Sequence, residues 1–205
     1  MTIHELVASL EPEINAVRQQ IHENPKLGLK EYNTSALIEK ELREKTHVDR
    51  IEHIGETGLL VEIKGTKPGA AHCIALRGDM DALPIKEDES HELRSRTDGI
   101  MHACGHDGHA TIGLGVAKVL MSIKDQLHGT VKLIFQPAEE GVRGAKSIVD
   151  NGHLDGVDYL IGSHVTNKKE DDPAVVIPGS YGSLATTKYD VIFHGKSAHA
   201  GGSPE

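Results

Sequence analysis

The sequence has few aromatic residues and few cysteines. Its 205 residues include no Trp, only two Phe and two Cys, and aromatic residues make up 3% of the chain. The core must therefore be built from aliphatic side chains, and a framework of several disulfides is excluded. The hydrophobic content of 38% suits a globular protein, and the length allows one domain and the beginning of a second.

Basic stretches and long apolar runs are also missing. The formal net charge is -9, and the Lys and Arg residues form no basic stripe. We therefore expect neither nucleic acid nor an anionic membrane as a partner. No run approaches the ~18 apolar residues that cross a bilayer, and the first residues lack the pattern of a secretory signal. These absences favour a cytoplasmic protein.

Histidine, by contrast, is concentrated in one short stretch. Residues 101–110 read MHACGHDGHA and precede an apolar, helix-like run. Imidazole nitrogen and thiolate sulfur are ligands that an ion such as zinc selects, and Cys104 and His106 can reach one ion across Gly105. We interpret the stretch as half of a metal site, with His102 and His109 in supporting or structural roles. The alternative is a histidine-rich surface loop with a buried cysteine.

Apolar periodicity predicts alternating helices and strands. Continuously apolar runs suit strands that are covered on both faces, and their alternation with helices predicts an α/β fold with a mostly parallel sheet and flanking helices. Asn33, Thr34 and Ser35 offer a cap for the second helix. The predicted helices span 3–22, 33–45, 109–123 and 144–151, and the predicted strands span 50–54, 58–64, 72–77, 131–136 and 159–163.

The pattern changes after His164. A polar loop is followed by two predicted strands, 174–177 and 186–194, the second with the alternation of a half-buried antiparallel strand. We therefore predict one domain over 1–178 and the beginning of another over 179–205. The sequence stops before the second domain could close a core.

Polar residues follow the carboxyl ends of the three apolar strands. Asp79 and Asp81 follow the first strand, Glu139 and Glu140 the second, and His164 the third. In open α/β sheets ligands bind at this edge. We therefore expect these groups to meet Cys104 and His106 in one crevice.

The adjacent glutamates suggest a division of roles. Successive side chains on an extended backbone point to different sides, so we predict Glu140 as a metal ligand and Glu139 as a general base. Asp79 would orient a histidine ligand or the base. A solvated turn is the alternative for the glutamates, Asp81 is assigned equally to the site or to a turn, and Asp107 is either a helix cap or a catalytic group.

Three motifs together resemble one enzyme family. Residues 77–84 (RGDMDALP), 101–109 (MHACGHDGH) and 136–141 (QPAEEG) are similar to the aminoacylase, hippurate hydrolase and auxin-conjugate amidohydrolase branch of the dinuclear metallopeptidases, metallopeptidase family twenty. Residues 184–201 look most like aminobenzoyl-glutamate hydrolase. Further matches are Arg18, His22, Pro25, Gly28, Glu31 and residues 195–200.

The resemblance implies a zinc-exopeptidase-like catalytic domain and a metal-dependent amidohydrolase. Such an enzyme cleaves N-acyl or N-aroyl amino acids with two divalent ions, Mn²⁺ or Zn²⁺, and works as a homodimer. Glu139 would be the general base and Asp79 a supporting acid. His199 resembles a lid-domain histidine that steadies the developing oxyanion in the partner's active site. The implied metal ligands are Cys104, His106, Glu140 and His164.

The sequence also departs from this family in its length. Family members are much longer, with an inserted α+β lid and dimerisation domain followed by a final histidine ligand. We therefore expect the amino-terminal part of such an enzyme, ending inside the lid. A truncated, non-catalytic metal-binding fragment is the alternative. The motifs of zinc base deaminases and of His-Glu-x-x-His proteases are absent from the sequence.

Overall fold

The computed structural model describes residues 1–141, 144–165, 179, 191–192 and 194–195. The chain divides into two compact units, Met1–Asn167 and Lys168–Glu205, and the fold described below is that of the first. The expected strands over 174–177 and 186–194 fall almost wholly outside the described residues. The domain boundary near residue 178 also lies there and stays a prediction.

The chain begins with two helices that are close to the predicted ones. Helix α1 spans Ile3–Glu23 and starts with a capping box, in which Thr2 and Glu5 each accept a hydrogen bond from the other's backbone N–H. Helix α2 spans Tyr32–Lys40 and continues into a π-helical turn, η1, over Glu41–Thr46. The predicted cap of α2 is wrong, because Thr34 and Ser35 are buried inside the helix and Glu31 occupies the N-cap position.

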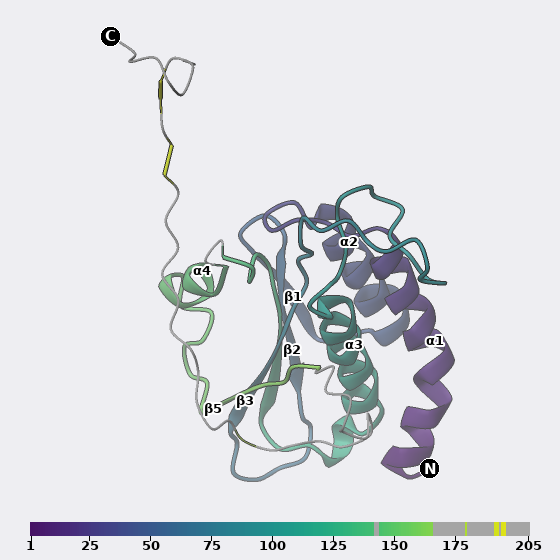
Figure 1. The fold of residues 1–205 in the computed structure, drawn as a ribbon. Helices are drawn as coiled ribbons and strands as arrows, with labels where there is room; N and C mark the ends of the chain where they lie inside the picture. Colours follow the sequence, from purple (N-terminus) through teal and green to yellow (C-terminus); the bar gives the residue numbers. More distant parts are fainter. Residues whose placement is uncertain (142–143, 166–178, 180–190, 193, 196–205) are drawn as a thin grey trace, which may run out of the picture. The chain divides into compact units, whose positions relative to one another are not determined.

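Five strands form one sheet in the order β1-β2-β4-β3-β5 (Figure 1). Strand β3 is parallel to both β4 and β5, whereas β2 is antiparallel to β1 and β4. Four of the five strands therefore point the same way, which confirms the mainly parallel sheet. The strands are β1 (Arg50–Ile54), β2 (Gly58–Lys64), β3 (Cys73–Asp79), β4 (Thr130–Gln136) and β5 (Tyr159–Gly162).

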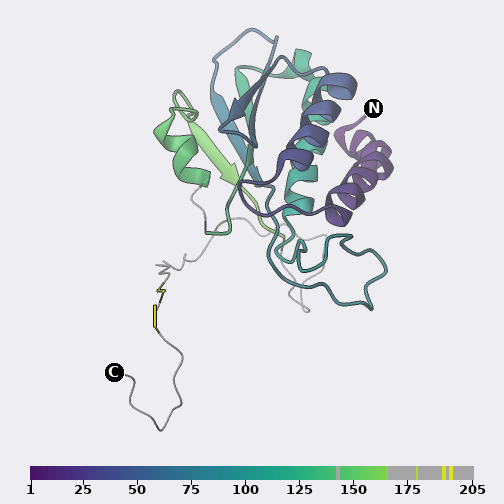
Figure 2. The same ribbon diagram turned by 90° about the horizontal axis from the view of Figure 1, so that it is seen from above.

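Helices cover both faces of this sheet. Figure 2 shows α1, α2 and α3 (His106–Ser122) on one side and α4 (Gly144–Asp150) on the other; the short 3-10 helix η2 (Lys124–Gln126) follows α3. Successive side chains of β4 point to opposite faces of the sheet and join both hydrophobic clusters. Leu133 and Phe135 pack with residues of α3, while Ile134 packs on the α4 side. No helix among the described residues is long and apolar enough to cross a membrane.

Candidate metal centre

The parallel register brings three strand ends together. Asp79 at the end of β3 pairs with Gln136 at the end of β4, and Arg77 pairs with Gly162 at the end of β5. The segments that follow these strands therefore leave the sheet at one edge. This edge is where open α/β sheets bind ligands, and the predicted site residues in the described part of the chain gather there.

A glycine brings the cysteine-histidine stretch to this edge. Gly105 has φ 82 and directly precedes α3, which begins at His106. A Cβ atom on Gly105 would lie 2.4 Å from Cγ2 of Val165. Only glycine combines this left-handed backbone with so close a neighbour. The turn is what allows Cys104 and His106 to face the same space.

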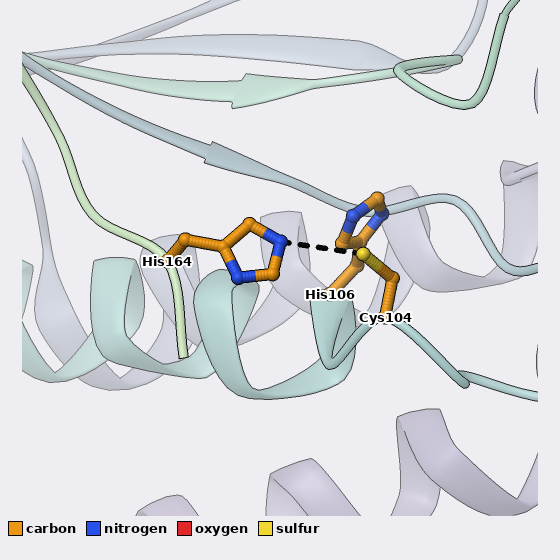
Figure 3. A group of neighbouring side chains, drawn as sticks. All are labelled: Cys104, His106 and His164. Carbon is orange, nitrogen blue, oxygen red and sulfur yellow. Dashed lines mark hydrogen bonds between the residues drawn. The ribbon is translucent and has the colours of Figure 1, made fainter. Parts of the chain in front are cut away.

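Cys104, His106 and His164 form the first cluster (Figure 3), and their ligand atoms all lie within 4.8 Å of one another. Cys104 Sγ is 3.2 Å from His164 Nε2. His164 Nδ1 lies 2.5 Å from the carbonyl oxygen of Val165, which only accepts hydrogen bonds, so Nδ1 carries the proton. The lone pair of Nε2 therefore points toward the cysteine, as a metal ligand would require.

His106 is the buried centre of the site. Its side chain is 1% exposed, yet neither ring nitrogen makes a hydrogen bond with the described residues. Nδ1 lies 3.3 Å from Asp81 Oδ1, while Nε2 lies 3.5 Å from Asp79 Oδ1 and 4.0 Å from Glu140 Oε1. A buried polar group normally has a partner. Sulfur, imidazole and carboxylate donors around an unsatisfied imidazole fit a divalent ion.

The two glutamates differ in exposure. Glu140 is half-buried and faces His106, whereas Glu139 is exposed. Their backbone N–H groups both donate to Asp81, at 2.9 Å to Oδ1 and 2.9 Å to Oδ2. His106, Glu139 and Glu140 also form a cluster of possible ligands. Asp81 therefore lies in the site rather than in a solvent-exposed turn.

Asp79 is fixed from two sides. Its Oδ1 is 2.5 Å from His109 Nδ1 and its Oδ2 accepts a 2.5 Å bond from Arg77. The backbone N–H of Val165 donates to His109 Nε2, so the proton of this ring lies on Nδ1, facing Asp79. Burial alone would raise the pKa of Asp79, but the His109 bond and the Arg77 charge hold that pKa at about 2.

The pKa of Cys104 is shifted upward, in contrast to that of Asp79. Burial raises the pKa of this thiol to about 11, and the negative charge of Glu140 adds to the rise. The same charge favours a cation beside the sulfur. A bound divalent ion would reverse the local field and hold the cysteine as thiolate.

A second polar network lies at the first turn of α3. Asp107 accepts a 3.0 Å bond from His22 Nδ1 and lies 3.1 Å from Arg18 Nε, so it is not a helix cap. The bond to Asp107 raises the pKa of His22. Neighbouring His102 is buried without a hydrogen-bond partner among the described residues, and desolvation lowers its pKa to about 4. The supporting or structural interpretation of His102 suits this burial.

Two buried acids lacked a firm assignment in the sequence. Glu31 was only a family match, yet its carboxyl accepts the backbone N–H of Ala138, and Asp81 accepts the next two N–H groups. A carboxylate following an apolar strand was the signal for Asp81. No local pattern marks Glu31, whose partner lies 107 residues away. The predicted oxyanion residue, His199, lies outside the described residues.

The chain resembles a peptidase family and proteins named as a carboxypeptidase and as a hydrolase. Peptidase family M20/M25/M40 matches residues 75–201. The chain is 42% identical over 198 residues to thermostable carboxypeptidase 1 of Saccharolobus solfataricus, covering 94% of this chain and 49% of that protein. It is 48% identical over 159 residues to indole-3-acetyl-aspartic acid hydrolase of Enterobacter agglomerans, covering 74% of this chain and 35% of that protein.

A solved structure supports the same assignment. The dinuclear metal-binding peptidase of family M20 from Bacillus subtilis superposes with a TM-score of 0.72 at 38% identity, covering 80% of this chain and 44% of that one. The chain spans about half the length, or less, of these relatives. Since the family match extends over more than half of the sequence and a solved member shares the fold, the chain belongs to peptidase family M20/M25/M40.

Proposed function

We propose that the protein is a metal-dependent amidohydrolase that cleaves the amide bond of N-acyl or N-aroyl amino acids. The observation that carries the proposal is the cluster of Cys104, His106 and His164, in which the buried His106 ring has no hydrogen-bond partner among the described residues. Two relatives are named as a carboxypeptidase and as a hydrolase of indole-3-acetyl-aspartic acid. Both names describe cleavage next to a free amino-acid carboxylate, which supports this substrate class.

The chain would hold its ions through donors of three kinds. Zn²⁺ accepts sulfur, nitrogen and oxygen, and Mn²⁺ accepts nitrogen and oxygen readily. When bound, the two ions would polarise the scissile carbonyl and lower the pKa of the attacking water. The proposed ligands are Cys104, His106, Glu140 and His164.

The remaining steps belong to side chains of the protein. Glu139 is exposed beside the cluster and would take the proton from the attacking water, then pass it to the leaving nitrogen. Asp79 would keep His109 fixed, and His109 in turn holds the backbone of Val165 next to His164. We assign to His199 of a partner subunit the stabilisation of the oxyanion in a cytoplasmic homodimer.

The first experiment measures metal content and turnover together. The protein is purified without chelator, analysed for metal, and assayed on hippurate, N-acetyl amino acids and aminobenzoyl-glutamate with added Mn²⁺ or Zn²⁺. Bound metal with turnover supports the proposal. Bound metal without turnover on any of these substrates favours the alternative, a metal-binding chain that is not itself a catalyst.

Replacing the general base tests the mechanism. Glu139→Gln should lower kcat by at least about 10²-fold, the lower range for general acid-base catalysis, while metal affinity stays unchanged. Glu140→Gln is the matched variant, because it alters the adjacent residue and should weaken metal binding instead. Normal turnover of Glu139→Gln would refute the assignment of the base.

A further inference from the structure

Three consecutive backbone N–H groups at the end of β4 are held by two buried acids. Ala138 N donates to Glu31 Oε1 at 2.8 Å, whereas Glu139 N and Glu140 N donate to the two oxygens of Asp81. Glu31 is 0% exposed and Asp81 is 1% exposed. The segment that carries both proposed functional glutamates is therefore anchored through its main chain rather than through their side chains.

The first of the three residues has an unfavourable backbone conformation. Ala138 has φ 50 and is 0% exposed. Residues with a Cβ atom rarely adopt this left-handed region, so surrounding contacts must maintain it. The turn at Ala138 decides the direction in which Glu139 and Glu140 leave the strand. A contact that maintains this turn also maintains the directions of both side chains.

Glu31 makes such a contact and does not serve its own helix. It occupies the N-cap position of α2, but its side chain makes no capping hydrogen bond. Its second oxygen accepts a 2.8 Å bond from Thr57 Oγ1, just before β2. Its carboxyl therefore reaches away from α2, braced by Thr57, to the strand end that carries the glutamates.

The turn is also restricted on its other side. Gly144 N donates to the carbonyl of Ala138 at 3.1 Å. A Cβ atom on Gly144 would lie 1.7 Å from the carbonyl oxygen of Pro137, so the chain returns against itself at this point. Ala138 is therefore bonded at its N–H by Glu31 and at its carbonyl by Gly144, so both ends of the residue are held.

We propose that Glu31 is a positioning residue for Glu139 and Glu140 and acts through the backbone of Ala138. The inference rests on the proposed function for the roles of those two glutamates. Glu31 belongs to none of the groups of possible metal ligands among the described residues. Its loss should release the Ala138 turn, which would displace the general base and weaken the ligand Glu140.

Four variants test whether Glu31 positions the two glutamates or only stabilises the fold. Glu31→Ala removes both bonds. Glu31→Gln keeps an acceptor for Ala138 and can donate to the Thr57 hydroxyl. Thr57→Val removes the Thr57 bond alone and is the matched control for losing one buried hydrogen bond. Glu31→Ala with Ala138→Gly adds a residue that adopts the left-handed backbone without strain.

Two readouts do not require turnover. Amide hydrogen exchange at Glu139 and Glu140, measured by NMR, reports whether the segment is held, and calorimetric titration with Zn²⁺ reports ligand placement. In Glu31→Ala the amides of Glu139 and Glu140 should exchange at least about tenfold faster, because their protection depends on the Ala138 turn. The exchange rates of amides in β2 and β3 should not change. The Zn²⁺ affinity of this variant should fall about 10-fold, as for other residues that orient ligands.

The other variants should lose less exchange protection and less Zn²⁺ affinity than Glu31→Ala. Glu31→Gln and Thr57→Val should stay within about threefold of the unmodified protein in both readouts, since each keeps the Ala138 bond. The added Ala138→Gly change should recover part of the lost affinity. If Glu31→Ala does not fold, Glu31→Asp replaces it. The aspartate side chain is one methylene shorter, so its carboxyl does not reach the N–H of Ala138.

The proposal is overturned if Glu31→Ala, or Glu31→Asp in its place, leaves exchange and Zn²⁺ affinity unchanged. It is also overturned if Thr57→Val causes the same losses, since these would then follow from any buried defect. Failure of the proposed function is a separate result, namely turnover that persists in Glu139→Gln. Exchange and affinity decide the role of Glu31 whatever the outcome of that assay.

Discussion

The candidate metal centre has two halves that differ in how their side chains are held. The inner half is at most 3% exposed, whereas the outer half is half-buried or exposed. Hydrogen bonds to Arg77 and to backbone amides fix much of the inner half. The side chains of the outer half make fewer such bonds, so a bound ion would contribute most to their order. The inner half comprises Asp79, Asp81, His106 and His109, and the outer half comprises Cys104, Glu139, Glu140 and His164.

This comparison predicts that changes in the inner half damage folding as well as binding. Asp79→Asn removes the negative charge that Arg77 and His109 share. Breaking a buried ion pair should lower the free energy of unfolding by about 3 kcal/mol, measured by urea denaturation. The control is Asp150→Asn on the surface of α4, where the pair with Lys146 should contribute no more than about 0.5 kcal/mol. Equal effects of the two variants would contradict the comparison.

Acid should destabilise the metal-free protein through His102, which lies beside the inner half. Its folded pKa of about 4 lies below its ordinary value of 6.5, so the unfolded chain binds the proton first. Its contribution is present above pH 6.5 and is lost as the pH falls toward 4. The loss should reach about 3 kcal/mol, at 1.36 kcal/mol per unit of pKa. Urea denaturation in chelator at several pH values measures it.

The variant His102→Phe serves as the control for this titration. Phenylalanine fills a similar volume without a titrating group, so the stability of the variant should change less between pH 6.5 and 4. An unchanged pH dependence in His102→Phe would show that other groups cause the acid effect.

Changes in the outer half should spare folding. His164→Ala alters an exposed side chain beyond the edge strand, so the free energy of unfolding of the metal-free protein should change by no more than about 0.5 kcal/mol. Zn²⁺ affinity should nevertheless fall at least about 10-fold, because a proposed ligand is lost. A large loss of stability in the metal-free state would place His164 in the inner half instead.

Most of the fold could be predicted because its signals are local. Continuous apolar runs identified β3, β4 and β5, and the polar residues after them identified the edge where His106, Glu140 and His164 lie. Among the described residues, the predicted helices and strands lie within a few residues of observed ones, and α3 begins at His106 rather than at His109. Gly105 explains the difference. Its left-handed backbone lets the helix begin directly after it, before the apolar residues from which the helix was predicted.

Contacts between distant residues were the part that could not be predicted. Asp107 is of a residue type that often caps helices, but His22 and Arg18 on α1 bind its carboxylate instead. Thr34 and Ser35 resemble a cap and are buried within α2. Glu31 carries no local sign of its bond to Ala138. For Asp107 and Glu31 the fold supplies a partner that short-range preferences do not anticipate, whereas Thr34 Oγ1 is buried without a hydrogen-bond partner among the described residues.

The position of His164 has a consequence for the edge of the sheet. Strand β5 pairs with β3 alone among the described strands, and its four residues are all exposed. An ion shared by Cys104 and His164 would join two points 60 residues apart, closing a loop much as a disulfide does. A bound ion would then keep β5 from separating from β3, so that it would stabilise the fold in addition to the catalytic role proposed for it.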